Sequence, residues 1–193
     1  MERTEAIVVE RARGGDAEAF RELVESYSPR LFRLAWRITG DEHSAEDAVQ
    51  ETFLRAYRSL ARFDARAQFS TWLHRIAVNA ALDLARKQQN RSRHEGWLDG
   101  PDGEEEPLPS PAPGPDRLAL GVEVERAVRS ALAGLSAMER TAFVLRHFEG
   151  RSIAEICEQL GLGVSAGKQA VFRAVQKLRR VLEPLVQRQE VKL

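Results

Sequence analysis

The chain has 193 residues, 43% of them hydrophobic and 30% charged, and its 29 basic residues balance its 29 acidic ones. This composition is typical of one ordinary soluble domain or two small ones. The single cysteine excludes a disulfide framework, and residues 1–16 hold no apolar run long enough for a signal peptide or a membrane span, so we expect a protein of the reducing cytoplasm with no membrane insertion.

Before position 95, apolar residues recur at the intervals expected for amphipathic helices. Asp16 is predicted to cap the first helix. Ser28 followed by Pro29 predicts that a new helix begins there, and Gly40 predicts its end. The apolar side of this helix is expected to include Trp36.

Two more helices are predicted in this part of the chain. Ser44 and Asp47 resemble a capping box for the first of them, and Ser70 is predicted to cap the second. No run of alternating residues long enough for a strand occurs anywhere. The sequence therefore predicts an all-α protein.

One helical face between residues 44 and 60 lies away from the apolar side. Positions i, i+3, i+4 and i+7 on this face are Asp47, Gln50, Glu51 and Leu54. A leucine within an acidic patch suits an interface with a basic protein. The same acids also suit a solvated helix start, where they favour the macrodipole, and both interpretations stay open.

The following helix presents Trp72, Arg75 and Asn79 on a face outside its apolar stripe. An indole near a guanidinium and a carboxamide suits stacking and hydrogen bonding to unstacked bases. The alternative is that Trp72 packs against the preceding helices. Phe69, Ser70 and Thr71 lie just before it and extend the candidate surface.

Residues 95–116 are predicted to form a disordered linker. They hold seven acidic residues, no lysine or arginine, six of the eight prolines and four glycines. Such a segment has too few apolar side chains to form a packed core, and this favours disorder. At roughly 3 Å per residue its 22 residues could span about 65 Å.

Further helices are predicted after this linker. One covers about residues 117–135, and the next two begin at the capping boxes Ser136–Glu139 and Ser152–Glu155. Gly150 is predicted to separate these two, and a final helix follows residue 163. The chain is thus expected to hold two helical modules, 1–94 and 117–193.

The stretch GLGVSAGKQAVFR, residues 161–173, raises the question of a phosphate-binding loop. Its glycines have the wrong spacing for a P-loop, and Gln169 stands where the magnesium-binding hydroxyl would be. A dinucleotide-binding loop would have to follow a strand, whereas a capped helix precedes this one. A helix-turn-helix fits instead, with base-reading and phosphate-binding side chains on its second helix. A basic helix that merely closes a small bundle is the alternative.

No catalytic constellation is found in the sequence. The histidine and glutamate at 43 and 46 have the reverse of the spacing used by di-metal helical bundles. Cys157 occupies an apolar helix position and is expected to be a small buried residue. We therefore expect a protein that is not an enzyme and holds no metal or cofactor.

The segments 44–64 and 69–87 resemble region 2 of the extracytoplasmic-function sigma factors of bacterial RNA polymerase, within the sigma-70 family, and residues 135–162 with the final helix resemble their region 4. The resemblance implies promoter-specific transcription initiation without catalysis. It implies core RNA polymerase, promoter DNA and an anti-sigma factor as partners. The alternative function is a stand-alone helix-turn-helix transcriptional regulator.

The resemblance also implies roles for single residues. The positions that match polymerase-binding residues of the family are Asp47, Gln50, Glu51 and Leu54. Those that match residues recognising the −10 element are Phe69, Ser70, Thr71, Trp72, Arg75 and Asn79. Those that match residues recognising the −35 element are Arg151, Ser152, Lys168, Gln169, Phe172 and Arg173.

The chain departs from the family pattern at several positions. Gly167 replaces a β-branched residue, which is expected to weaken the helix by up to about 1 kcal/mol. Ala170 and Val175 replace basic residues, which leaves the strength of −35 recognition open. His74 stands where a tyrosine is common.

Overall fold

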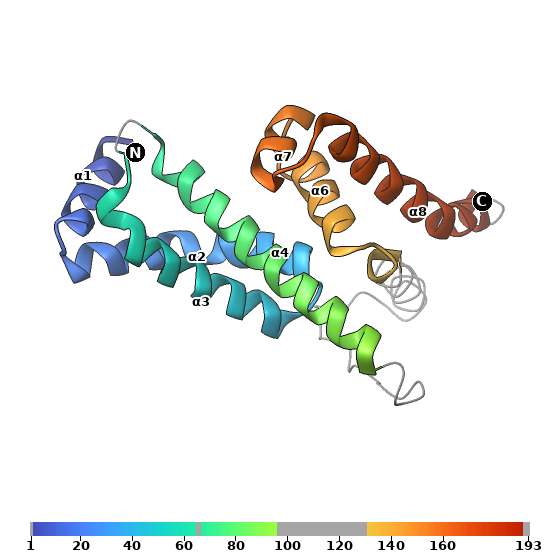
Figure 1. Ribbon diagram of the computed structural model, residues 1–193, viewed down its shortest axis with the longest axis horizontal. Helices are drawn as coiled ribbons and strands as arrows, with labels where there is room; N and C mark the ends of the chain where they lie inside the picture. The colour runs from blue at the N-terminus through green and yellow to red at the C-terminus, as the bar shows by residue number, and fades with distance from the viewer. Residues whose placement is uncertain (1, 65–66, 96–130, 191–193) are drawn as a thin grey trace.

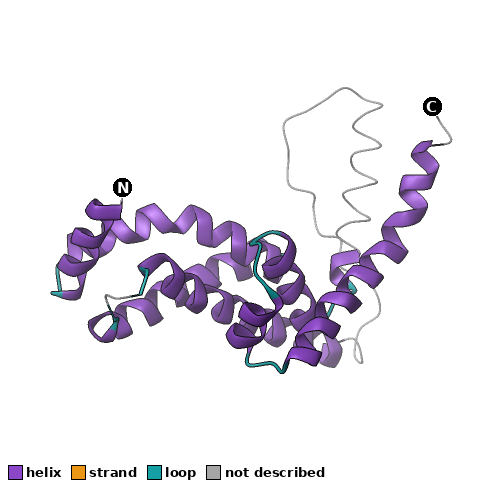
Figure 2. Cartoon of the chain, turned by 90° about the horizontal axis from the view of Figure 1, so that it is seen from above, coloured by secondary structure: helices purple, strands orange, loops and turns teal. Residues whose placement is uncertain are grey.

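The computed structural model describes residues 2–64, 67–95 and 131–190. The predicted linker 95–116 and the predicted helix 117–135 lie almost wholly outside these residues. The described part of the chain is helical and contains no strand (Figure 2). Its elements are α1 (Glu2–Arg13), α2 (Ala17–Thr39), α3 (Glu42–Ser59), η1 (Leu60–Arg62), α4 (Phe69–Glu95), α6 (Ala137–His147), α7 (Ile153–Leu160) and α8 (Val164–Glu190).

Helix α2 is continuous, so the prediction of a helix start at Ser28 was wrong. Pro29 lies inside the helix. The Ser28 hydroxyl does not cap a new helix but donates to the Val24 carbonyl one turn back, at 2.6 Å. Both halves of α2 are buried against neighbouring helices, with Leu23 before the proline and Leu34 after it. This packing outweighs the local proline signal.

Two other helix starts also differ from the prediction. Helix α3 is capped by Asp41, whose carboxylate accepts from the Ser44 amide at 2.8 Å, so Ser44 is already helical. Helix α4 begins at Phe69, one residue before the predicted cap Ser70. The caps at Asp16, Ser136 and Ser152 are confirmed, as is the end of α2 at Gly40.

Helices α1 to α4 form the first module, in which α2, α3 and α4 contact one another (Figure 1). Helix α1, which the sequence reasoning missed, buries Val9 and Ala12 beside α2. Helices α6, α7 and α8 form the second module. Helix α6 also contacts α2 and α4, so the two modules pack against each other. No helix among the described residues is sufficiently long and apolar to cross a membrane.

Candidate nucleic-acid and protein interfaces

The candidate polymerase-binding face lies on the outer side of α3. Ala48 and Thr52 point into the core, whereas Leu54 is 50% exposed and Gln50 is also exposed. Asp47 and Glu51 are partly exposed on the same helix. The α3 helix thus presents the predicted combination of an exposed leucine and acidic side chains.

Glu51 on this face has a partner within the chain. Its Oε1 accepts from Arg55 Nε at 2.7 Å, and Arg55 Nη1 reaches Asp83 of α4 at 3.3 Å. The hydrogen bonds that Arg55 donates to Glu51 and to Asp83 both raise its pKa. Asp47 lies 3.8 Å from His43 Nε2. Glu51 is therefore linked to α4 through Arg55, whereas the contact of Asp47 with His43 is longer.

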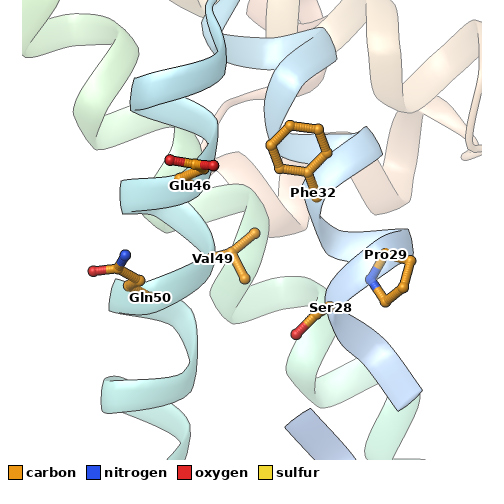
Figure 3. A pocket seen from close by; sticks show the side chains of 6 residues that line it. All are labelled: Ser28, Pro29, Phe32, Glu46, Val49 and Gln50. Carbon is orange, nitrogen blue, oxygen red and sulfur yellow. The ribbon is translucent and has the colours of Figure 1, made fainter. Parts of the chain in front are cut away.

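A shallow hollow of about 490 Å³ adjoins this face between α2 and α3 (Figure 3). Phe32 and Val49 supply apolar surface, and Gln50 belongs both to the hollow and to the acidic face. The remaining lining residues are Ser28, Pro29 and Glu46. The sequence reasoning did not find this hollow, because it forms between two helices whose relative placement no local pattern specifies.

An aromatic cluster fixes the start of α4. The Trp72 ring centroid lies 4.9 Å from that of Phe63 and 5.5 Å from that of Phe69, and Phe69 also packs edge-on against Tyr27. Phe69 is only 6% exposed, so its ring belongs to the core. Trp72 is partly exposed. Its ring therefore packs against Phe63 and Phe69, as one interpretation predicted, and still presents part of its surface to solvent.

Tyr27 connects this cluster to α1. Its hydroxyl donates to Glu5, and it also interacts with Ser70 at the start of α4. Burial raises the pKa of Tyr27 well above its ordinary value, as does the hydrogen bond to Glu5. The first turn of α4 is thus held by α1 and α2 together.

The candidate −10 surface continues along α4 from this anchored end. Thr71 and Arg75 are exposed, and Ser70 and Asn79 are partly exposed. Arg75 Nη1 lies 3.4 Å from Glu158 Oε1 of α7. The structure therefore brings a predicted −10 residue next to the helix-turn-helix of the other module.

The second module holds a helix-turn-helix made by α7 and α8. Ser152 and Glu155 form the reciprocal capping box of α7, and Gly161 ends that helix with φ +64°, a left-handed conformation that favours glycine. The outer side of α8 exposes Lys168, Gln169, Phe172 and Arg173. These predicted −35 residues lie together on one face.

The opposite side of α8 explains one departure from the family pattern. Ala170, Ala174 and Leu178 are buried there. A cation at position 170 would therefore have to leave this packed side to reach DNA. The alanine suits its buried environment.

Arg151 and Ser152 are placed differently from the exposed residues of α8. The Ser152 hydroxyl accepts from the Glu155 amide at 3.2 Å, so its oxygen serves the α7 cap. Arg151 is half-buried and donates to Glu155 Oε1 at 3.3 Å. The backbone hydrogen bond from Ser152 is the largest cause that lowers the pKa of Glu155.

The described residues contain no group of three or more His, Cys, Asp or Glu side chains that could hold a metal ion. Cys157 is 5% exposed, and its thiol lies 3.6 Å from the Gly163 carbonyl. This confirms the prediction of a small buried residue.

Comparison with known proteins identifies both modules. Residues 23–91 match Sigma-70 region 2, and residues 125–178 match Sigma-70, region 4. The chain is 31% identical to the ECF RNA polymerase sigma factor SigW of Bacillus subtilis, over 92% of this chain and 96% of SigW. It is 33% identical to the RNA polymerase sigma-H factor of Pseudomonas aeruginosa, over 93% of this chain and 94% of that protein.

A solved structure supports the same relationship. CnrH, in complex with the cytosolic domain of CnrY, is 28% identical to this chain with a TM-score of 0.60. The similarity covers 93% of this chain and 97% of CnrH. It therefore extends over both modules.

Proposed function

The chain belongs to the extracytoplasmic-function sigma factors of the sigma-70 family, and we propose that α3, α4 and α8 divide polymerase binding, −10 recognition and −35 recognition among them. A sigma factor is a non-enzymatic subunit of RNA polymerase that directs transcription initiation. One observation supports the assignment of surfaces: most of the predicted residues are exposed or partly exposed on α3, α4 and α8, apart from the buried Phe69 and from Arg151 and Ser152 at the start of α7.

Core polymerase is proposed to bind the outer face of α3. Leu54 supplies exposed apolar area, and Asp47, Gln50 and Glu51 surround it with polar and acidic groups. A central apolar anchor within a polar rim is the usual anatomy of a protein interface. The hollow beside Gln50 extends the same surface towards α2.

The −10 element is proposed to bind along α4 from Thr71 to Asn79. A flipped base needs a stacking surface and an edge that donates and accepts. Trp72 supplies the first, and the Asn79 carboxamide supplies the second. Phe69 acts from the core, where it holds Trp72 in place.

The −35 element is proposed to bind the outer face of α8. Lys168 and Arg173 offer cations for base edges or phosphates, and Gln169 offers an amide. Phe172 is 62% exposed, which makes it available for apolar contact with a thymine methyl group. Arg151 pairs with Glu155 of α7, and Ser152 caps that helix.

An anti-sigma factor is the proposed regulatory partner. The related CnrH was solved with the cytosolic domain of CnrY. We propose that this chain likewise acts in the cytoplasm and is held there by such a protein.

Transcription in vitro with purified core polymerase on a promoter library tests the assignment. We expect transcripts only when core polymerase and this chain are both present, from promoters that share a −10 and a −35 sequence. A stand-alone regulator would instead bind one duplex site tightly without polymerase, and that result would contradict the proposal.

A further inference from the structure

The exposed side of α2 changes its charge along the helix. The first half exposes three glutamates, Glu18, Glu22 and Glu25. Residues 27–39, in contrast, hold three arginines and no acidic residue. The second half of α2 therefore presents positive charge to a partner.

Arg30, Arg33 and Trp36 lie next to one another on this second half. They follow at intervals of three residues, which makes them neighbours on one side of a helix. All three are exposed, and within the described ranges neither Arg30 nor Arg33 forms an ion pair and no ring stacks on Trp36. Arg37 differs, because its guanidinium covers the Phe148 ring at 4.6 Å. Two cations and an indole are thus open to solvent together.

Arg30 lies within electrostatic reach of the first turns of α4. Burial raises the pKa of Tyr27, which interacts with Ser70 of α4, and the charge of Arg30 opposes this shift. Burial lowers the pKa of His74 of α4, and Arg30 lowers it further. Helices α2 and α4 also contact each other (Figure 1). The basic half of α2 therefore adjoins the proposed −10 surface.

The proposed −10 surface has few cations of its own. Arg75 is the only cation among its six residues, and it lies 3.4 Å from Glu158 of α7. Phosphate contacts supply much of the affinity for a nucleic acid, whereas base contacts supply the specificity. A strand whose bases are read by Trp72 and Asn79 therefore needs phosphate contacts from outside this set. The two unpaired arginines of α2 can provide them.

We propose that Arg30, Arg33 and Trp36 form a binding surface for single-stranded DNA, the α2 DNA surface, which continues the −10 surface and holds the displaced promoter strand. The arginines bind its phosphates, and one base stacks on the indole. At 1.5 Å per residue, Trp36 lies about 9 Å along the helix from Arg30, the length of roughly two to three stacked nucleotides. The inference rests on the proposed function, because only a chain that opens a promoter meets such a strand.

The test uses the holoenzyme of core polymerase and the full chain, with a fluorescent promoter selected from the library. The promoter is prepared fully paired, and with mismatches that leave the −10 segment and the nucleotides after it unpaired. Arg30→Ala combined with Arg33→Ala removes the two cations, and Trp36→Ala removes the indole. Arg21→Ala is the matched control, because it removes an exposed arginine from the acidic half of the same helix.

We expect the double arginine variant to bind the unpaired promoter with a slope of log affinity against log salt that is shallower by about 1.4, since each single-strand phosphate contact contributes about 0.7. Lysine at both positions should restore the slope, because a point charge suffices for a phosphate. Trp36→Ala should weaken binding about fivefold or more with the slope unchanged. The base preference within the −10 element, and binding of the paired promoter in the cold, where it stays closed, should change little in either variant.

Equal affinity and equal salt slope in the variants and the unmodified chain would overturn the proposal, and so would an equal loss in Arg21→Ala. Loss of affinity for core polymerase in the absence of DNA would also overturn it, because the α2 DNA surface would then belong to the polymerase interface. If the unmodified chain selects no promoter from the library, the proposed function itself fails, and this is seen before any variant is made.

Discussion

The Cys157 sulfur fills the space that a side chain at position 167 would need. A Cβ placed on Gly167 would overlap Cys157 Sγ, and the methyl of Ile153 closes the same site at 3.9 Å. Gly167 lies inside α8, where glycine costs about 1 kcal/mol relative to alanine. The departure from the family pattern is thus explained by contact between α7 and α8.

Because of this contact, we expect the effect of Gly167→Ala on the free energy of unfolding to change sign when Cys157 is also replaced. Gly167→Ala alone should lower the free energy of unfolding, by about 1–3 kcal/mol, because the extra methyl group overpacks the site. In the Cys157→Ala background the same change should stabilise, since the room exists and alanine favours the helix. Urea unfolding of the four proteins measures the coupling. Additive effects would show that the two residues do not compete for one space.

Local signals in the sequence predicted much of the second module correctly. Ser136 and Ser152 each cap a helix through neighbours within a few residues, and both caps were predicted. The signals failed at Ser28 and Pro29, because burial of α2 on both sides of the proline outweighs a local preference.

The contact between the modules could not be predicted from the sequence. Arg140 and Gly40 are 100 positions apart, and each has an ordinary local explanation, as an exposed helical cation and as a helix terminator. The candidate surfaces were easier to predict from the sequence, because helical spacing alone places Lys168 and Arg173 on the outside of α8. Trp36 shows the limit of such spacing: it was expected on the apolar side but is 46% exposed.

Reversal of the charge at Asp47 should weaken polymerase binding. Asp47→Arg changes a partly exposed side chain on the outer face of α3, so the fold should stay intact. A reversed charge at a protein interface typically costs several kcal/mol. Arg58→Glu, exposed near the other end of α3, is the control and should have little effect. Equal polymerase affinity of the Asp47→Arg variant and the unmodified chain, with unchanged circular dichroism, would remove this face from the interface.

Asn79→Ala should impair promoter opening more than initial binding. The carboxamide can donate to and accept from a flipped base edge, and loss of that contact is felt only once the strands separate. Permanganate reactivity of thymines in the −10 region measures this opening directly. Arg86→Ala, an exposed change two turns further along α4, serves as the control. Reactivity that Asn79→Ala leaves unchanged would exclude Asn79 from the reading surface.

His74 should make the stability of the protein depend on pH below neutrality. Burial lowers the pKa of His74 from 6.5, and Arg151 and Arg30 lower it further. Glu149, whose Oε2 lies 3.4 Å from His74 Nε2, opposes the shift without reversing it. Arg37 contacts the other oxygen of Glu149 at 3.8 Å.

The sign follows from the lowered pKa. Above pH 6.5 the histidine is neutral in both states and its burial is tolerated. As the pH falls below 6.5 the unfolded chain gains a proton that the folded chain resists, so stability is lost, by at most about 1.4 kcal/mol per pH unit. Urea unfolding between pH 7.5 and 5.5 should show this loss in the unmodified chain and a flatter profile in His74→Gln. Parallel profiles would contradict the lowered pKa.

The outer face of α8 should show two kinds of DNA contact. Loss of a bidentate base contact costs roughly 1–3 kcal/mol and relaxes the preference at one base pair. Loss of a phosphate contact weakens all sequences alike and lowers the salt slope by about one. Lys168 lies near the start of the helix, where side chains reach base edges, and Arg173 lies more than one turn later.

We therefore expect Lys168→Ala to relax −35 specificity and Arg173→Ala to reduce the salt dependence. Transcription from variant −35 elements across a salt series measures both effects. Arg180→Ala, exposed two turns beyond Arg173, is the control for a general loss of positive charge. If Lys168→Ala and Arg173→Ala changed neither specificity nor salt dependence, α8 would be a helix that only closes the bundle. The exposed Phe172 between them would then require another explanation.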